Sequence, residues 1–235
     1  MTNRPLAVGF DFDHTLGTDQ HLERHAFGRL ARELGWPVNI EEPDLRDLIE
    51  RLLSGFRTAE LTMERMLWGF TAALPPSANG MDRSPETLTE RYREICFSLV
   101  DELVRPVEDA VECITALVDN GFRVGILTNG WSPLRERKIA KALGYFPGPV
   151  LVSESIGAYK PSAEAFRQLA SALGCGASEL WYVGDNPVAD IDGARSYGLP
   201  AVWLADHAAP YPPGLRSPTA RIDRLAALTP IVRGG

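Results

Sequence analysis

The stretch LAVGFDFDHT at residues 6–15 decides how the rest of the chain is organised. Residues 6–10 are a short apolar run, which predicts a buried strand of a parallel sheet. A crossover helix should then lead to a neighbouring strand, yet residues 18–105 show almost no strand pattern. Four stretches with helical periodicity fill this segment instead: Asp19–Leu34, Pro43–Leu53, Glu60–Leu74 and Pro85–Val104. We therefore expect a helical domain inserted after the first strand.

Strands and helices alternate from Val107 onward. Apolar, β-rich runs occur at residues 122–128, 149–155, 180–185 and 201–205, separated by stretches typical of helices. This βαβ pattern predicts an α/β fold, a Rossmann-like doubly wound parallel sheet. We assign residues 1–17 and 106–235 to this core and residues 18–105 to an inserted α-helical cap domain.

Composition limits the classes of protein to which the chain can belong. Hydrophobic residues make up 45%, enough for a folded core, and the net charge of −7 argues against a nucleic acid polymer as partner. No apolar run approaches the roughly 20 residues of a membrane span, and no signal peptide precedes the first acidic residues. We therefore expect no membrane contact and a cytoplasmic location. Cys96, Cys113 and Cys175 are too few and too far apart for a disulfide scaffold or a zinc site.

Two carboxylates follow the first predicted strand. In an extended segment, Asp11 and Asp13 point the same way and present both carboxylates to one spot. Such a pair repels unless it shares a proton or a cation. The alternative is that Asp13 or Thr15 merely caps a turn.

Three further polar groups follow later strands, where open α/β sheets place their ligand crevice. These are Thr128 and Asn129, then Lys160, and then Asp185 with Asp190. Each alone has an ordinary explanation, such as a turn, a solvated lysine or a helix N-cap. Pro161 predicts that a helix begins directly after Lys160.

These motifs, in this order, resemble those of the haloacid dehalogenase-like hydrolase superfamily. The matching segments are DFDHT, ILTNG, GAYKP and VGDNPVAD, and the resemblance runs from Leu6 to about Leu204. The inserted helices look like the C1 cap of subfamily I. In appearance the chain is most similar to the branch of pyrimidine 5′-nucleotidases and N-acylneuraminate-9-phosphatases.

The resemblance implies a phosphatase reaction with Mg²⁺ as cofactor. Asp11 would be the nucleophile that forms an aspartyl-phosphate, and Asp13 the general acid and base. Mg²⁺ would be held by the Asp11 carboxylate, the Asp13 backbone carbonyl and Asp185. Asp190 would order metal-bound water.

The remaining motif residues would handle the phosphate. Thr128 and the Asn129 amide would bind phosphate oxygens, and Lys160 would offset the charge of Asp11 and the phosphoryl group. The resemblance leaves open whether His14 shapes the pocket, because that position is more often Gly or Asn. Trp131 is compatible with substrate stacking or with the core.

The expected partner is a small phosphorylated metabolite, and the expected assembly is a monomer or homodimer. The substrate stays open between nucleotides, sugar phosphates and phosphoglycolate. Haloacid dehalogenases lack the second acid, and phosphonatases need a cap lysine that residues 18–105 do not contain. A non-catalytic binding module conflicts with four intact motifs. Candidate cap residues for substrate selection are Arg24, Arg57, Arg65 and Trp68.

A group of large apolar residues in the third helical stretch offers two interpretations. Met63, Met66, Leu67, Trp68 and Phe70 would line a cofactor site or form the core of a helical bundle. Their spacing favours the bundle core.

Overall fold

A computed structural model describes residues 7–36, 38–74, 82–206 and 208–234. The chain divides into two compact units, which we name the sheet unit (residues 1–18 and 105–235) and the helical unit (residues 19–104). Each unit is described by itself below.

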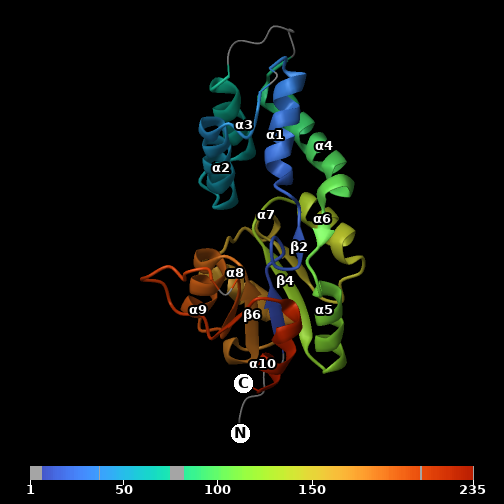
Figure 1. Ribbon diagram of the computed structural model, residues 1–235, viewed down its shortest axis with the longest axis vertical. Coiled ribbons are helices and arrows are strands. Elements are labelled where there is room, and N and C mark those ends of the chain that lie inside the picture. Colours follow the sequence, from blue (N-terminus) through green and yellow to red (C-terminus); the bar gives the residue numbers. More distant parts are fainter. Residues whose placement is uncertain (1–6, 37, 75–81, 207, 235) are drawn as a thin grey trace. The chain divides into compact units, whose positions relative to one another are not determined.

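A six-stranded sheet forms the centre of the sheet unit (Figure 1). Its order is β5-β4-β1-β6-β7-β8, and every pair of neighbours is parallel. The strands are β1 (Ala7–Phe10), β4 (Arg123–Thr128), β5 (Val150–Val152), β6 (Leu180–Gly184), β7 (Ala201–Leu204) and β8 (Ala220–Ile222). The predicted fold class is confirmed, and β1, with its acidic continuation, lies between β4 and β6.

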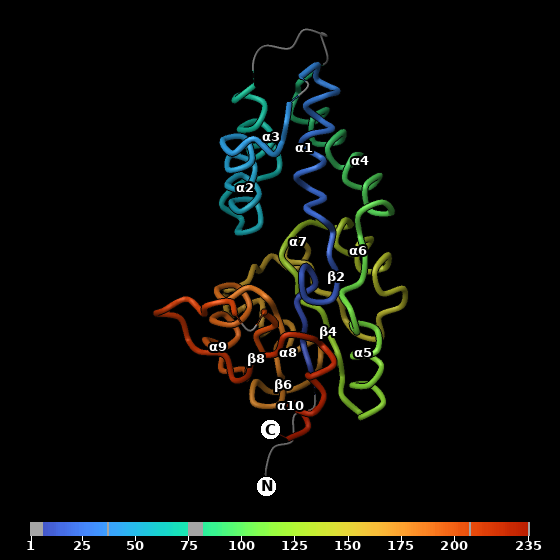
Figure 2. The backbone as a smooth tube through the Cα atoms, viewed as in Figure 1, coloured from blue at the N-terminus to red at the C-terminus, as the bar shows by residue number. Residues whose placement is uncertain are grey.

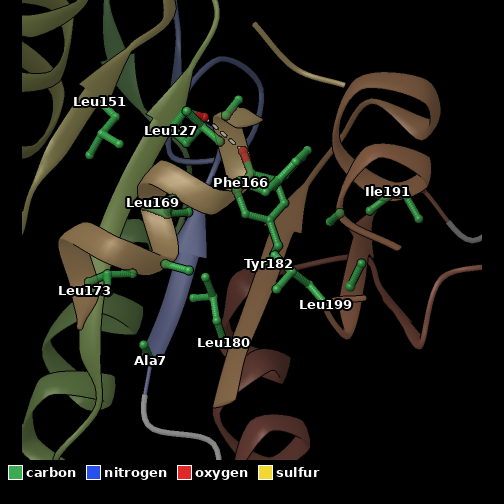
Figure 3. Close-up of a cluster of buried hydrophobic side chains, with 14 of the residues drawn as sticks. Ala7, Leu127, Leu151, Phe166, Leu169, Leu173, Leu180, Tyr182, Ile191 and Leu199 are labelled. Carbon is green, nitrogen blue, oxygen red and sulfur yellow. Dashed lines mark hydrogen bonds between the residues drawn. The ribbon is translucent and has the colours of Figure 1, made fainter. Parts of the chain in front are cut away.

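Helices connect most of these strands along the chain, whereas β8 follows β7 with no helix between them in the described residues. The α-helices of the sheet unit are α5 (Ala110–Asp119), α6 (Leu134–Leu143), α7 (Ser153–Ile156), α8 (Ala163–Leu173), α9 (Gly193–Tyr197) and α10 (Leu228–Gly234). Figure 3 shows Leu169 and Leu173 of α8 directed at the sheet. A Cβ atom on Gly9 of β1 would lie 2.5 Å from Leu169 Cδ2, so glycine lets this helix approach the central strand.

The start of α8 differs from the sequence prediction. Pro161 does not begin the helix; α8 begins at Ala163, and the Ser162 side chain accepts a hydrogen bond from the Ala165 backbone N–H. The serine therefore supplies the N-cap, and a short non-helical link separates Lys160 from the helix.

A second, two-stranded sheet was not predicted. It pairs β2 (Gly17–Thr18) antiparallel with β3 (Arg105–Pro106), where the chain leaves and re-enters the sheet unit. Figure 2 traces the excursion between these two points. Strands of two residues are too short to carry any hydrophobic period, so the sequence offered no signal for them.

In the described residues of the helical unit, 19–36, 38–74 and 82–104, the helices are α1 (Leu22–Glu33), α2 (Pro43–Arg57), α3 (Met63–Ala72) and α4 (Pro85–Leu103). The ring of Phe27 lies 4.6 Å from that of Phe70 and 5.0 Å from that of Tyr92, measured between centroids, so α1, α3 and α4 share one aromatic core. Among the helices of the described ranges, none combines the length and the apolar character needed to cross a membrane.

The bundle-core interpretation of α3 is confirmed for four residues and wrong for Trp68. Met63, Met66, Leu67 and Phe70 are buried, whereas Trp68 is 70% exposed. One residue turns an α-helix by about 100°, so Trp68 lies beside the stripe that its neighbours share.

Candidate active site

The carboxyl ends of three neighbouring strands bring the motif residues of the sheet unit together. Asp11 follows β1, Thr128 ends β4, and Asp185 follows β6. Because β1 pairs with both β4 and β6 in parallel register, these residues lie at one edge of the sheet. The Asp11 backbone N–H also donates to Val183 O at 2.9 Å, which extends the ladder to the first carboxylate.

Lys160 is the buried cation at this edge. It is 3% exposed, and its Nζ lies 2.7 Å from Asp11 Oδ1 and 2.7 Å from Asp190 Oδ1. A third hydrogen bond, 3.1 Å long, joins Nζ to the Tyr182 hydroxyl, so all three ammonium protons have partners. Burial by itself lowers the pKa of Lys160, but the attraction of Asp11 and Asp190 outweighs it and holds the pKa well above the usual range.

Asn129 and Tyr182 hold Lys160 in this place. The Asn129 side chain forms two hydrogen bonds of 2.9 Å with the Lys160 backbone, donating to its carbonyl and accepting from its N–H. The Tyr182 hydroxyl donates to Leu127 O at 2.9 Å, a bond drawn in Figure 3. The Asn129 side-chain amide is thus engaged with the backbone of the loop that carries Lys160.

Three aspartates crowd around the same point. Ligand oxygens of Asp11, Asp185 and Asp190 lie within 4.8 Å of one another. Burial, together with the charges of Asp11 and Asp190, raises the pKa of Asp185 to about 8. Lys160 supplies one positive charge to these three carboxyl groups, and carboxylate oxygens at this spacing are the ligands that Mg²⁺ prefers. The donor set therefore fits a hard divalent cation.

Asp190 differs from the other two aspartates because both of its oxygens already have donors. Oδ1 accepts from Lys160, and Oδ2 accepts from the Asn186 backbone N–H at 2.9 Å. Burial raises the pKa of Asp190 to about 6, although the charge of Lys160 works in the opposite direction. A Cβ atom on Gly184 would lie 2.4 Å from Asp190 Cγ, so only glycine at that position admits the carboxylate.

Asp13 has two partners that the sequence did not reveal. Arg135 Nη1 donates to Asp13 Oδ2, and Lys138 Nζ donates to Asp13 Oδ1, from adjacent turns of α6. Both cations are buried, with 1% and 0% exposure. Their spacing of three residues places them on one helix face. This spacing was the signal in the sequence that the two cations act on one partner. It is a weak signal, because charged residues at such spacing usually face solvent.

Comparison with known proteins identifies the family. A model of haloacid dehalogenase-like hydrolases matches residues 6–198. The chain belongs to this family. The predictions of a hydrolase and of this family's fold are therefore confirmed.

Relatives of this hydrolase include several phosphatases. It is 34% identical over 139 residues to a phosphoserine phosphatase of Thermus thermophilus, a match covering 58% of this chain and 55% of that protein. A glyceraldehyde 3-phosphate phosphatase of Methanopyrus kandleri is 26% identical over 84% of this chain and 83% of its own length. The pyrimidine 5′-nucleotidase PynA of Streptococcus pneumoniae is 22% identical over 84% and 83%, respectively.

Solved structures agree on the fold. The HAD-hydrolase YfnB of Bacillus subtilis, in a structure bound to magnesium, superposes with a TM-score of 0.76 at 24% identity. The match covers 97% of this chain and 99% of that protein.

The sequence left the roles of Trp131 and His14 open, and the structure shows the surroundings of both residues. Trp131 is completely buried, so it is a core residue and does not stack on a substrate from this position. His14 is exposed and has a φ of 58°, in the left-handed region that glycine and asparagine tolerate best. This backbone shape explains why Gly or Asn is more frequent at that position.

The candidate cap residues all lie on α1, α2 and α3 of the helical unit. Arg57 forms a 2.7 Å ion pair with the buried Glu23, and Arg24 lies 3.7 Å from Glu41. Arg65 and Trp68 are exposed. None of these observations tests a role in substrate selection, which stays a prediction.

Proposed function

We propose that this hydrolase is a Mg²⁺-dependent phosphomonoesterase that acts on a small phosphorylated metabolite. The observation that carries the proposal is the placement of Asp11 against the buried Lys160, beside two further aspartates. A carboxylate that is held next to a cation is suited to attack phosphorus, where negative charge accumulates. The phosphatase names of the relatives support the same reaction class.

In the first step, an Asp11 oxygen forms a bond to phosphorus and the ester P–O bond breaks. Asp13 gives a proton to the departing alcohol oxygen. In the second step, water attacks the aspartyl-phosphate, gives a proton to Asp13, and releases Asp11 and inorganic phosphate. The sum is ester plus water to alcohol plus phosphate, with Asp11 and Asp13 regenerated.

The other residues would lower the barrier by binding charge. Lys160, which donates a hydrogen bond to Asp11, would offset the charge of the phosphoryl group, while Thr128 and the Asn129 backbone N–H would bind phosphate oxygens. Asp11, Asp185 and the Asp13 carbonyl would hold Mg²⁺, which neutralises charge on the phosphoryl oxygens when bound. The occupied oxygens of Asp190 support its place outside the metal's own ligands.

Single residues distinguish the phosphatase from the alternative reaction classes. Asp13 disfavours a dehalogenase, because a halide needs no proton to leave. The absence of lysine from residues 18–105 disfavours a phosphonatase. Nucleotides, sugar phosphates and phosphoglycolate stay open as substrates, and so do the monomer and homodimer.

The test is hydrolysis of p-nitrophenyl phosphate with Mg²⁺ by wild type and Asp11→Asn. We expect the variant to lose all measurable turnover, because an amide cannot replace the nucleophile. Asp44→Asn, the same change at an exposed aspartate of α2, should keep wild-type turnover. Undiminished activity of Asp11→Asn would falsify the mechanism. Phosphate release from a panel of phosphorylated metabolites would then identify the substrate.

A further inference from the structure

We propose that Arg135 and Lys138 of α6 are positioning residues for Asp13, which hold its carboxylate in place for proton transfer. This inference rests on the proposed phosphatase mechanism. It concerns two residues that none of the four motifs contains.

Both oxygens of the Asp13 carboxylate are held, each by a different cation. One hydrogen bond would leave the carboxylate able to rotate about its last torsion, whereas two contacts at opposite oxygens fix its plane. Each carboxylate oxygen has two lone pairs, so either oxygen keeps a site for the transferred proton. The side chain of Asp13 is 25% exposed, which leaves it accessible from solvent.

The cations themselves are fixed by their surroundings. Lys138 lies under the ring of Phe12, with Nζ 5.7 Å from the centroid, and Phe12 is completely buried. Arg135 packs against Gly130, where a Cβ atom would lie 2.0 Å from its Nε. The loop that follows β4 and the loop that follows β1 therefore both contact the cations of α6.

Burying two cations in this way is unfavourable without a compensating anion. Lysine or arginine side chains that point from α6 into solvent would avoid this cost. Fixing a reacting group in place has a large effect on the reaction rate, because misplacement by about 1 Å can lower the rate about 100-fold. The buried pair is thus better explained by the need to orient Asp13 than by stability alone.

The experiment compares wild type, Lys138→Met and Asp13→Asn with p-nitrophenyl phosphate and phenyl phosphate. The two esters have similar shapes, but phenolate is the poorer leaving group and needs the proton from Asp13. For Lys138→Met we expect kcat/KM for phenyl phosphate to fall about 10- to 100-fold. For p-nitrophenyl phosphate it should stay within about threefold. Asp13→Asn should show the same pattern more strongly.

A second readout follows from the second half of the reaction. With Asp13 misplaced, water attack on the aspartyl-phosphate becomes slow while its formation from p-nitrophenyl phosphate does not. Lys138→Met should therefore release a pre-steady-state burst of p-nitrophenolate close to one equivalent per active site. Lys138→Arg, which keeps the charge, should restore the wild-type pattern. Lys141→Met, the same change at an exposed position of α6, should behave as wild type.

Equal losses for both esters without a burst would overturn the inference and leave Lys138 a structural residue. If Lys138→Met does not fold, Arg135→Gln provides the same comparison. Active Asp11→Asn would instead overturn the proposed function. The two failures are thus distinguishable.

Discussion

Replacement of Lys160 by methionine tests how the site balances its charges. Methionine has nearly the volume of lysine but no charge, so Asp11 and Asp190 lose the ammonium that lies 2.7 Å from each of them. Removing one partner of a buried ion pair typically costs about 3–5 kcal/mol of unfolding free energy, because the other charge stays buried. We expect a loss of this size in metal-free protein at pH 8.

The loss of stability in Lys160→Met should be smaller at lower pH, because Asp190 becomes protonated there. The pKa of Asp190 is already raised to about 6 with Lys160 present, and without that cation it rises further. Between the unfolded pKa near 3.8 and this raised value, the folded state keeps a proton that the unfolded state has released. Stability therefore falls as pH rises through this window. At pH 5 the carboxyl is largely neutral, and Lys160→Met should be closer to wild type.

The assay is urea denaturation with a metal chelator at pH 5 and pH 8. Lys141→Met serves as the control, since it makes the same change at an exposed site. With Mg²⁺, Lys160→Met should also lose about 10²- to 10³-fold in kcat. A destabilisation below about 1 kcal/mol at pH 8, or one equal at both pH values, would refute the charge argument, since a buried pair predicts more.

Two more outcomes follow from the site. The pKa of about 8 leaves a proton on Asp185 that Mg²⁺ must displace on binding. The affinity for Mg²⁺, measured by calorimetry, should therefore increase from pH 6 to pH 8. An affinity that does not change with pH would contradict this prediction. Gly130→Ala should lose about 1–3 kcal/mol in urea denaturation, because its Cβ would overlap Arg135. Wild-type stability would show that Arg135 moves aside freely.

Local patterns predicted those parts of the fold that depend on periodicity. The short apolar runs ending at Phe10, Thr128 and Gly184 became neighbouring parallel strands. Helical spacing marked α1 to α4, although it could not reveal that Trp68 lies outside the buried stripe. The prediction that α8 begins at Pro161 was wrong, because Ser162 is the N-cap and the proline therefore lies outside the helix.

Within the site, the sequence identified the residues but not their contacts. Asp11 and Lys160 are 149 residues apart, and their bond could be expected only from the order of the motifs. The hydrogen bonds of Asn129 to the Lys160 backbone had no signal, since a T-N-G turn is compatible with many partners. The same holds for the contacts of the Tyr182 hydroxyl, because a tyrosine inside a predicted strand gives no sign of its hydrogen-bond partners.

By itself, the sequence determined that acids, a hydroxyl and a lysine follow the strands of a parallel sheet interrupted by a helical insertion. These features depend on residue type and spacing along the chain. Only the tertiary structure decided that Arg135 and Lys138 turn inward to Asp13, across 122 and 125 residues. A helix with charges on several faces can pack in more than one rotation. The side chains that turn inward are those that meet the Asp13 carboxylate and Gly130, which lie elsewhere in the chain.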